Sequence, residues 1–178
     1  MDGNIVLIGM PGAGKSTLGV LLAKSLGMSF VDTDLMIQQR CGALLGEIIA
    51  ARGNGEFLKI EEEVLCDASH LRSHVIATGG SAVLSARAMD ALRTDGTTVY
   101  IDVPYRVLRR RLRDMRARGV VFGEGETLRT VYDRRVPLYR MYADITYTHG
   151  REPIEVSLAG LIALLGCEKS GTAEVKDE

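Results

Sequence analysis

The segment from residue 4 to residue 17 constrains the fold of this chain more than any other part of its sequence. Residues 4–9 form a continuous apolar run, which is typical of a strand buried on both faces of a parallel sheet. The letters GMPGAGKS at residues 9–16 match the pattern GxxxxGK[ST], and Thr17 follows. From Lys15 onward, leucines near helical spacing predict a helix that ends at Gly27. A chance glycine-rich turn would rarely fall between a buried strand and a helix, so we interpret residues 9–16 as a phosphate-binding loop (P-loop).

Each part of this loop has a chemical reason. The glycines let backbone N–H groups approach a phosphate chain, and the helix that begins at Lys15 adds the positive end of its dipole. The Lys15 ammonium would place a charge on the β- and γ-phosphates of a nucleotide, and the Ser16 hydroxyl would ligate Mg²⁺. The nucleotide-binding residues predicted here are Gly12, Ala13, Gly14, Lys15, Ser16 and Thr17.

Apolar runs and helical spacings alternate along the rest of the chain, which predicts a parallel α/β sandwich. The sequence contains no repeat and no interdomain linker, so we expect one domain over residues 1–166 and a polar, frayed tail over residues 167–178. The expected strands after the first lie at residues 29–31, 74–78, 97–103 and 144–147. Later helices are expected at 35–40, 55–71, 85–93 and 153–165, with one that begins after Pro104 and another that ends at Tyr142.

Charge and composition exclude several classes of function. The formal net charge of −1 argues against a protein that coats nucleic acid or an anionic membrane. No apolar run approaches the roughly 18 residues that span a bilayer, and the first ten residues lack a basic leader. The three cysteines are scattered without a metal-binding pattern, as expected for reduced thiols. We therefore expect a cytoplasmic protein, and a monomer.

Two carboxylates follow the second expected strand. Asp32 and Asp34 are two apart, so in extended backbone their side chains face the same side, at the strand end where ligands bind in open α/β sheets. One could position a metal ion and the other could accept a proton from a hydroxyl group. Two alternatives remain open: Asp34 could only cap the following helix, and Asp102, at the end of the 97–103 strand, could be the acid on the metal side.

Arginines are concentrated between residues 106 and 118. Most of them fit a solvated helix face, and the lack of interleaved aromatics argues against a nucleic-acid groove. Arg118 differs because it begins a segment, residues 118–126, that carries three glycines and suggests a mobile flap. A flap arginine could stabilise the charge of a transferring phosphoryl group and exclude water.

Five stretches together resemble the shikimate kinase family of P-loop small-molecule kinases. Their order and spacing are more specific than a P-loop alone, and the resemblance covers roughly Ile5 to Leu165. The stretches are GMPGAGKST at 9–17, FVDTD at 30–34, GEFLKIEEE at 55–63, TGGSAV at 78–83 and RVPLY at 135–139.

The resemblance implies a three-layer sandwich with a five-stranded parallel sheet, a substrate-binding helical region after the second strand, and a lid. It implies an ATP-dependent kinase that uses Mg²⁺ and acts on a small hydroxy acid. On the nucleotide side, it implies that Lys15, Ser16 and Asp32 bind Mg-ATP and that Arg111 packs on the adenine. The implied catalytic residues are Lys15, Asp34 and the lid residue Arg118. The implied acceptor-binding residues are Asp34, Gly79, Gly80 and Arg135.

The sequence departs from the family on the acceptor side. The family's Glu-Phe-Arg reads Glu-Phe-Leu at residues 56–58, its triple glycine ends in Ser81, and its lid Arg-Pro-Leu has Gly119 after Arg118. The missing arginine would grip the carboxylate of shikimate, a contact whose loss costs more than about 1.5 kcal/mol, and Lys59 is a poor geometric substitute. Shikimate and a smaller hydroxy amino acid such as homoserine therefore both remain open as acceptors.

Other functions also remain open. A gluconate-like sugar acid is a further acceptor, and a nucleotide-binding regulatory protein without turnover is a further class. A guanine-reading NKxD pattern is absent from the sequence, which argues against a GTPase-like switch.

Overall fold

Five parallel strands form the centre of the protein, and their order across the sheet is β2-β3-β1-β4-β5. β1 is the middle strand, and every one of its residues is buried, as the apolar run predicts. The chain leaves β1 toward one edge of the sheet and leaves β3 toward the other, so a crevice opens between the carboxyl ends of these two neighbours. The computed structural model describes residues 3–115 and 125–170. The strands are β1 (Asn4–Ile8), β2 (Ser29–Asp32), β3 (His74–Ala77), β4 (Gly96–Asp102) and β5 (Ile145–Thr148).

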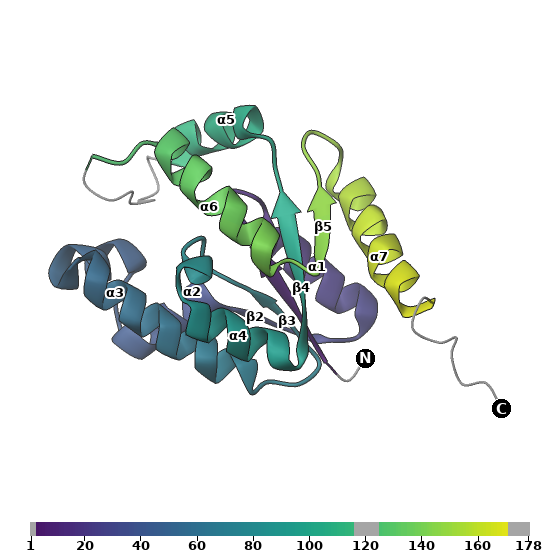
Figure 1. Ribbon diagram of the computed structural model, residues 1–178, viewed down its shortest axis with the longest axis horizontal. Coiled ribbons are helices and arrows are strands. Elements are labelled where there is room, and N and C mark those ends of the chain that lie inside the picture. Colours follow the sequence, from purple (N-terminus) through teal and green to yellow (C-terminus); the bar gives the residue numbers. More distant parts are fainter. Residues whose placement is uncertain (1–2, 116–124, 171–178) are drawn as a thin grey trace.

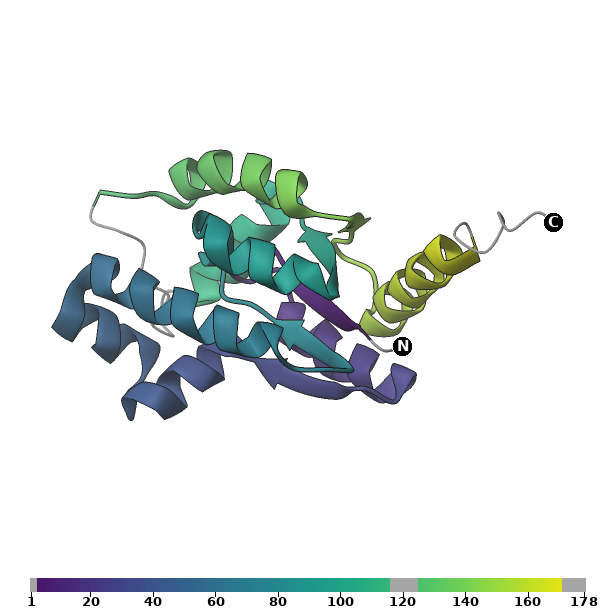
Figure 2. The same cartoon turned by 60° about the horizontal axis from the view of Figure 1, so that its bottom comes forward.

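Helices cover both faces of the sheet, which confirms the expected three layers (Figure 1). α1 and α7 pack against each other on one face, while α4 and α6 lie on the opposite face, with α3 packed against α4 (Figure 2). The helices are α1 (Lys15–Leu26), α2 (Thr33–Cys41), α3 (Leu45–Ser69), the 3₁₀ helix η1 (Ala82–Leu84), α4 (Ala86–Thr94), α5 (Tyr105–Met115), α6 (Leu128–Tyr142) and α7 (Ile154–Ser170).

Two apolar clusters hold these layers together. The main core surrounds β1, β3 and β4 and includes the fully buried Tyr100 and Tyr139, whose rings stack with centroids 5.2 Å apart. A smaller cluster joins α2 to α3 and is formed by Ile37, Ile48, Phe57, Ile60 and Val64. The second cluster fixes α2 and α3 beside the crevice, where their polar residues can reach it.

Two helices differ from the expectation. α3 begins at Leu45, ten residues before the predicted start, and bends at Gly53, whose φ of 78° is open to glycine but strained for other residues. α7 extends to Ser170, so helix enters the stretch that was predicted as a tail from residue 167, because glutamate and lysine at 168 and 169 favour helix. Residues 171–178 and most of the predicted flap lie outside the described residues.

Within residues 3–115 and 125–170, no helix combines the length and the apolar character that a membrane span requires.

Candidate active site

The P-loop wraps around the amino end of α1, directly after β1. Gly9 has a φ of 145°, and a Cβ at this position would lie only 2.7 Å from the Ile101 carbonyl oxygen of β4. Only glycine therefore lets the loop start this close to the sheet. Inside the loop, Lys15 Nζ donates hydrogen bonds to the carbonyl oxygens of Gly9, at 2.8 Å, and Met10, at 3.0 Å. Burial lowers the pKa of Lys15 to about 8, against the opposing charges of Asp34 and Asp32.

Asp32 connects the P-loop to the end of β2. Its Oδ2 accepts a 2.6 Å hydrogen bond from Ser16 Oγ, and its Oδ1 accepts one of 2.9 Å from the Asp34 backbone N–H. Asp32 is thus the N-cap of α2, and Asp34 is not a cap but lies in the first turn of the helix. Burial, followed by the charge of Asp32, raises the pKa of the Asp34 carboxyl, while Lys15 opposes the rise. The two carboxylates therefore do different things: one holds the P-loop serine, and the other is a half-buried, more basic group.

The loop after β3 closes the crevice against the P-loop. A Cβ on Gly80 would lie 2.6 Å from Pro11 Cδ, so the two loops touch through backbone. A Cβ on Gly79 would collide with Glu61 Oε1 and lie 2.8 Å from Asp34 Oδ1. Both carboxylates thus converge on this glycine.

Arg135 reaches the same loop from α6. Its guanidinium donates a 3.0 Å hydrogen bond to the Gly80 carbonyl oxygen, which also accepts one of 2.6 Å from the Tyr139 hydroxyl. Arg135 Nε is buried and has no hydrogen-bond partner among the described residues. A half-buried guanidinium with a free donor fits an anionic group of an acceptor.

Glu61 is a site residue for which the sequence reasoning assigned no role. It is 2% exposed, and its Oε1 has no hydrogen-bond partner in the described part of the chain. Burial raises the pKa of Glu61 to about 7, and a hydrogen bond from Ser81 and the charges of Arg135 and Lys15 oppose the rise. The sequence could have pointed to Glu61, because it shares the apolar face of its helix with Phe57 and Val64. Burying a carboxylate among apolar residues is costly, so its presence there indicates a function.

Leu58 lies one turn before Glu61 at the rim of a cavity of about 150 Å³ between α3 and the η1 region. Leu58 is 36% exposed, and Leu84 on the other rim is 38% exposed. Glu61, Leu65 and Ser81 also line the cavity. An apolar residue thus stands where the resemblance implies an arginine, beside a carboxylate that forms no ion pair with any residue the structure describes.

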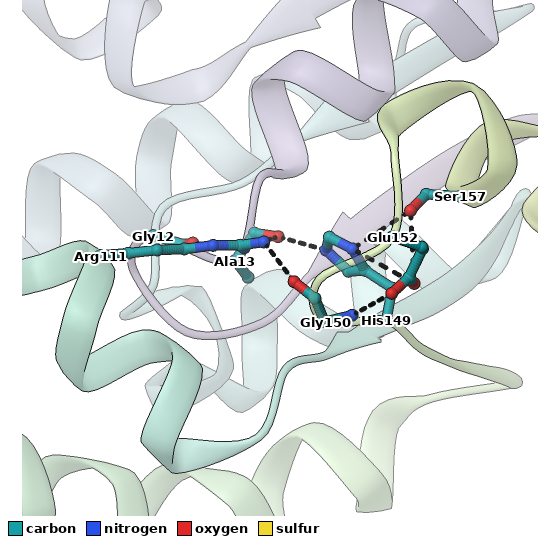
Figure 3. Close-up of polar contacts among 7 residues, drawn as sticks. All are labelled: Gly12, Ala13, Arg111, His149, Gly150, Glu152 and Ser157. Carbon is teal, nitrogen blue, oxygen red and sulfur yellow. Dashed lines mark hydrogen bonds and ion pairs between the residues drawn. The ribbon is translucent and has the colours of Figure 1, made fainter.

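The remaining predicted residues have different outcomes. Arg111 in α5 donates hydrogen bonds to the carbonyl oxygens of Gly12, at 3.1 Å, and Gly150, at 2.9 Å (Figure 3). Its expected contact with adenine stays a prediction. Asp102 accepts a 3.0 Å hydrogen bond from the Tyr100 hydroxyl, whereas Asp32 contacts the P-loop serine, so the geometry favours Asp32 on the metal side. Arg118 and Gly119 lie outside the described residues.

Comparisons with known proteins indicate the family to which the chain is similar. A family model described as shikimate kinase matches residues 11–165. A shikimate kinase of Nitrosomonas europaea is 39% identical over 170 residues, which cover 93% of this chain and 79% of that protein. One of Mycobacterium avium is 42% identical over 151 residues, covering 83% and 85%. A solved structure, shikimate kinase from Acinetobacter baumannii in complex with shikimate, superposes with a TM-score of 0.85 at 30% identity, covering 98% of this chain and 97% of that one.

Proposed function

The chain belongs to the shikimate kinase family, and from this premise we propose that it transfers the γ-phosphoryl group of ATP to a hydroxyl of a small hydroxylated carboxylic acid, with shikimate as the first candidate. One observation carries the proposal. A complete P-loop and two groups suited to an acceptor, Asp34 and Arg135, converge on the Gly79–Gly80 loop. The protein is expected to act as a cytoplasmic monomer.

Mg²⁺ fits the oxygen atoms at the start of α1. Ser16 Oγ and Asp32 Oδ2 lie 2.6 Å apart, and Mg²⁺ in kinases is held by one or two protein oxygens together with phosphate oxygens. Among the described residues no group of three or more histidines, cysteines and carboxylates could hold a metal alone, which agrees with a metal that arrives with the nucleotide. Ser16 and Asp32 would hold the ion, which would supply positive charge to neutralise the charge that develops on the phosphates.

The protein groups have separate roles in this reaction. Lys15 carries a positive charge at neutral pH, because its lowered pKa of about 8 is still above 7, and can place that charge on the transferred phosphoryl group. Asp34 can accept the hydroxyl proton of the acceptor, and the burial that raises the pKa of its carboxyl makes it a stronger base. Arg135 would bind the acceptor carboxylate beside the Gly79–Gly80 backbone. Arg118 is proposed to stabilise the phosphoryl charge from the lid.

A hydroxy amino acid is a second candidate acceptor, and Leu58 is the observation that favours it. Without an arginine at this position, no cation of the described residues is paired with Glu61, whose Oε1 faces the Gly79 loop. An acceptor with its own ammonium group would supply that cation, leaving its carboxylate for Arg135 and its hydroxyl for Asp34. A gluconate-like acid lacks the ammonium group and could offer Glu61 only hydroxyl donors.

A coupled assay of ADP release tests these acceptors. The panel is shikimate, L-homoserine, L-threonine and gluconate, with 4-hydroxybutyrate as the control that matches homoserine without its ammonium group. We expect turnover of shikimate well above the acceptor-free rate. A preference for homoserine over both shikimate and 4-hydroxybutyrate would replace shikimate by the amino acid. ATP binding without turnover of any acceptor would contradict the proposed function and favour a regulatory protein.

Leu58→Arg sharpens the assay. If shikimate is the acceptor, the restored arginine should improve its KM by about ten- to a hundredfold, as expected for a charge-assisted hydrogen bond. Leu164→Arg is the matched control, because Leu164 is similarly exposed, at 39%, but lies on α7 away from the crevice. An unchanged or weaker use of shikimate by Leu58→Arg, with Leu164→Arg like the wild type, would show that the cavity is shaped for another acceptor.

A further inference from the structure

His149 lies directly behind the P-loop, in the connection between β5 and α7 (Figure 3). The residue is 6% exposed, and its ring packs parallel to that of Tyr147 with centroids 6.1 Å apart. Its Nε2 lies 2.9 Å from the Ala13 carbonyl oxygen. A buried imidazole thus contacts the phosphate cradle from the side that faces away from the ligand.

The protonation of one ring nitrogen follows from its partner. A carbonyl oxygen only accepts hydrogen bonds, so Nε2 must carry the hydrogen that is donated to Ala13. The other nitrogen, Nδ1, lies 3.4 Å from Ser157 Oγ and 3.8 Å from Glu152 Oε1. Glu152 is itself held, because its Oε2 accepts a 2.9 Å hydrogen bond from the Gly150 N–H. The ring is therefore oriented from both ends.

The contact with Ala13 determines the direction of the next N–H group. The peptide between Ala13 and Gly14 is planar and trans, so the Gly14 N–H points opposite to the Ala13 carbonyl. Gly14 has a φ of 92° and no side chain, so this peptide can rotate more easily than one between two larger residues. Holding the carbonyl backward fixes the N–H toward the inside of the loop, where P-loops bind phosphate.

Arg111 holds the preceding carbonyl in the same way. Its Nη1 donates to Gly12 O, at 3.1 Å, and makes a longer contact of 3.5 Å with Ala13 O, while its Nη2 donates to Gly150 O, at 2.9 Å. The shorter contact with Ala13 O is that of His149, at 2.9 Å. Two carbonyls in a row are thus fixed by side chains from outside the loop, as Figure 3 shows. Arg111 is also a predicted nucleotide contact, so His149 is the residue whose effect on the loop can be measured separately.

We propose that His149, oriented at Nδ1 by the Ser157 hydroxyl, is a positioning residue that aligns the Ala13–Gly14 peptide for phosphate binding. The proposal depends on the P-loop binding ATP and not on the identity of the acceptor. It implies that loss of the Nε2 donor weakens the binding of the phosphates of a nucleotide and spares the binding of its nucleoside part.

The test compares ADP with adenosine, each by competition against a fluorescent ADP analogue. His149→Leu removes the donor and keeps an apolar side chain, and we expect ADP affinity to fall about tenfold, as for one hydrogen bond, while adenosine affinity changes less than about twofold. His149→Gln should recover most of the loss, because a glutamine amide N–H can reach the position of Nε2. The KM for the acceptor should be unchanged.

Three results would overturn the proposal: unchanged ADP affinity in His149→Leu, an equal loss for ADP and adenosine, or no recovery in His149→Gln. A lower Tm with an unchanged ratio of the two affinities would likewise mean that His149 only stabilises the fold. If His149→Leu does not fold, Ser157→Ala replaces it, since Ser157 Oγ is the group within hydrogen-bonding distance of Nδ1, at 3.4 Å. We expect a smaller loss of ADP affinity in that variant, again without a loss for adenosine, and no loss would contradict the proposal.

Discussion

Glu61→Gln should make this protein more stable at pH 8 and leave its stability unchanged at pH 4. The substitution removes the charge of a side chain that is 2% exposed and keeps its shape. Burial raises the pKa of the folded-state carboxyl from 4.5 to about 7. Because the folded pKa lies above the unfolded one, ionisation of Glu61 opposes folding. The cost is absent below pH 4.5, grows between pH 4.5 and 7, and is complete above pH 7.

The size of the effect follows from the shift. A pKa difference of this size corresponds to about 3 kcal/mol in the free energy of unfolding at pH 8. For a domain of this length, each kcal/mol changes Tm by about 2–4 °C, so the variant should unfold roughly 6–12 °C higher than the wild type. Urea unfolding and thermal melting at pH 5, 6, 7 and 8, without nucleotide or acceptor, would give the difference between the two proteins as a function of pH.

Glu62→Gln is the control for this measurement. Glu62 is the next residue, but Ser85 and Arg87 donate hydrogen bonds to its carboxylate and lower its pKa. The same substitution there should give no stabilisation at pH 8. A Glu61→Gln protein whose advantage does not grow between pH 5 and 8 would refute the idea that Glu61 is a buried carboxyl without a cationic partner. A gain in stability accompanied by a higher KM for the acceptor would indicate that the charge is retained for substrate binding.

Three further substitutions test the reaction. Lys15→Ala should reduce phosphoryl transfer at least a hundredfold with the fold intact by circular dichroism, because its charge acts on the phosphates; wild-type turnover would exclude the P-loop assignment. Asp34→Asn should lower kcat by about a hundredfold or more and leave ADP affinity unchanged, since proton acceptance is lost; weaker ADP binding with normal transfer would assign Asp34 to the nucleotide. Arg118→Ala should lower kcat with little change in the acceptor KM, measured by steady-state kinetics with both substrates varied. An unchanged kcat would mean that Arg118 has no catalytic role.

The centre of the sheet could be predicted from the sequence because its middle strands β3, β1 and β4 are largely buried. β1 and β4 appear as continuous apolar runs, and the P-loop sequence fixes where β1 ends and α1 begins. The first half of α3 could not be predicted in this way. Gly53 interrupts the helical pattern, and this half packs on a small separate cluster through few residues, such as Ile48.

The site could be predicted where residues lie at strand ends, and not where tertiary contacts decide their role. Asp34 and the Gly79–Gly80 pair follow β2 and β3, so the topology alone brings them together. Glu61 lies in the middle of a helix, and only the packing of α3 shows that its carboxylate faces the crevice. His149 is a single histidine after β5, and its contact with Ala13 joins residues that are 136 positions apart.

Leu58 and Glu61 are best understood together. They are three residues apart on a helix, so an arginine at position 58 could lie against the Glu61 carboxylate as well as against an acceptor. With leucine at position 58, no cation there opposes the burial that raises the pKa of Glu61. An arginine placed at position 58 should therefore return the pKa of Glu61 toward its usual range. The stability that Glu61→Gln adds at pH 8 should then shrink in a Leu58→Arg background. The acceptor that this protein uses must satisfy the same carboxylate, with an ammonium group or with hydroxyl donors, so the charge balance at Glu61 connects stability to specificity.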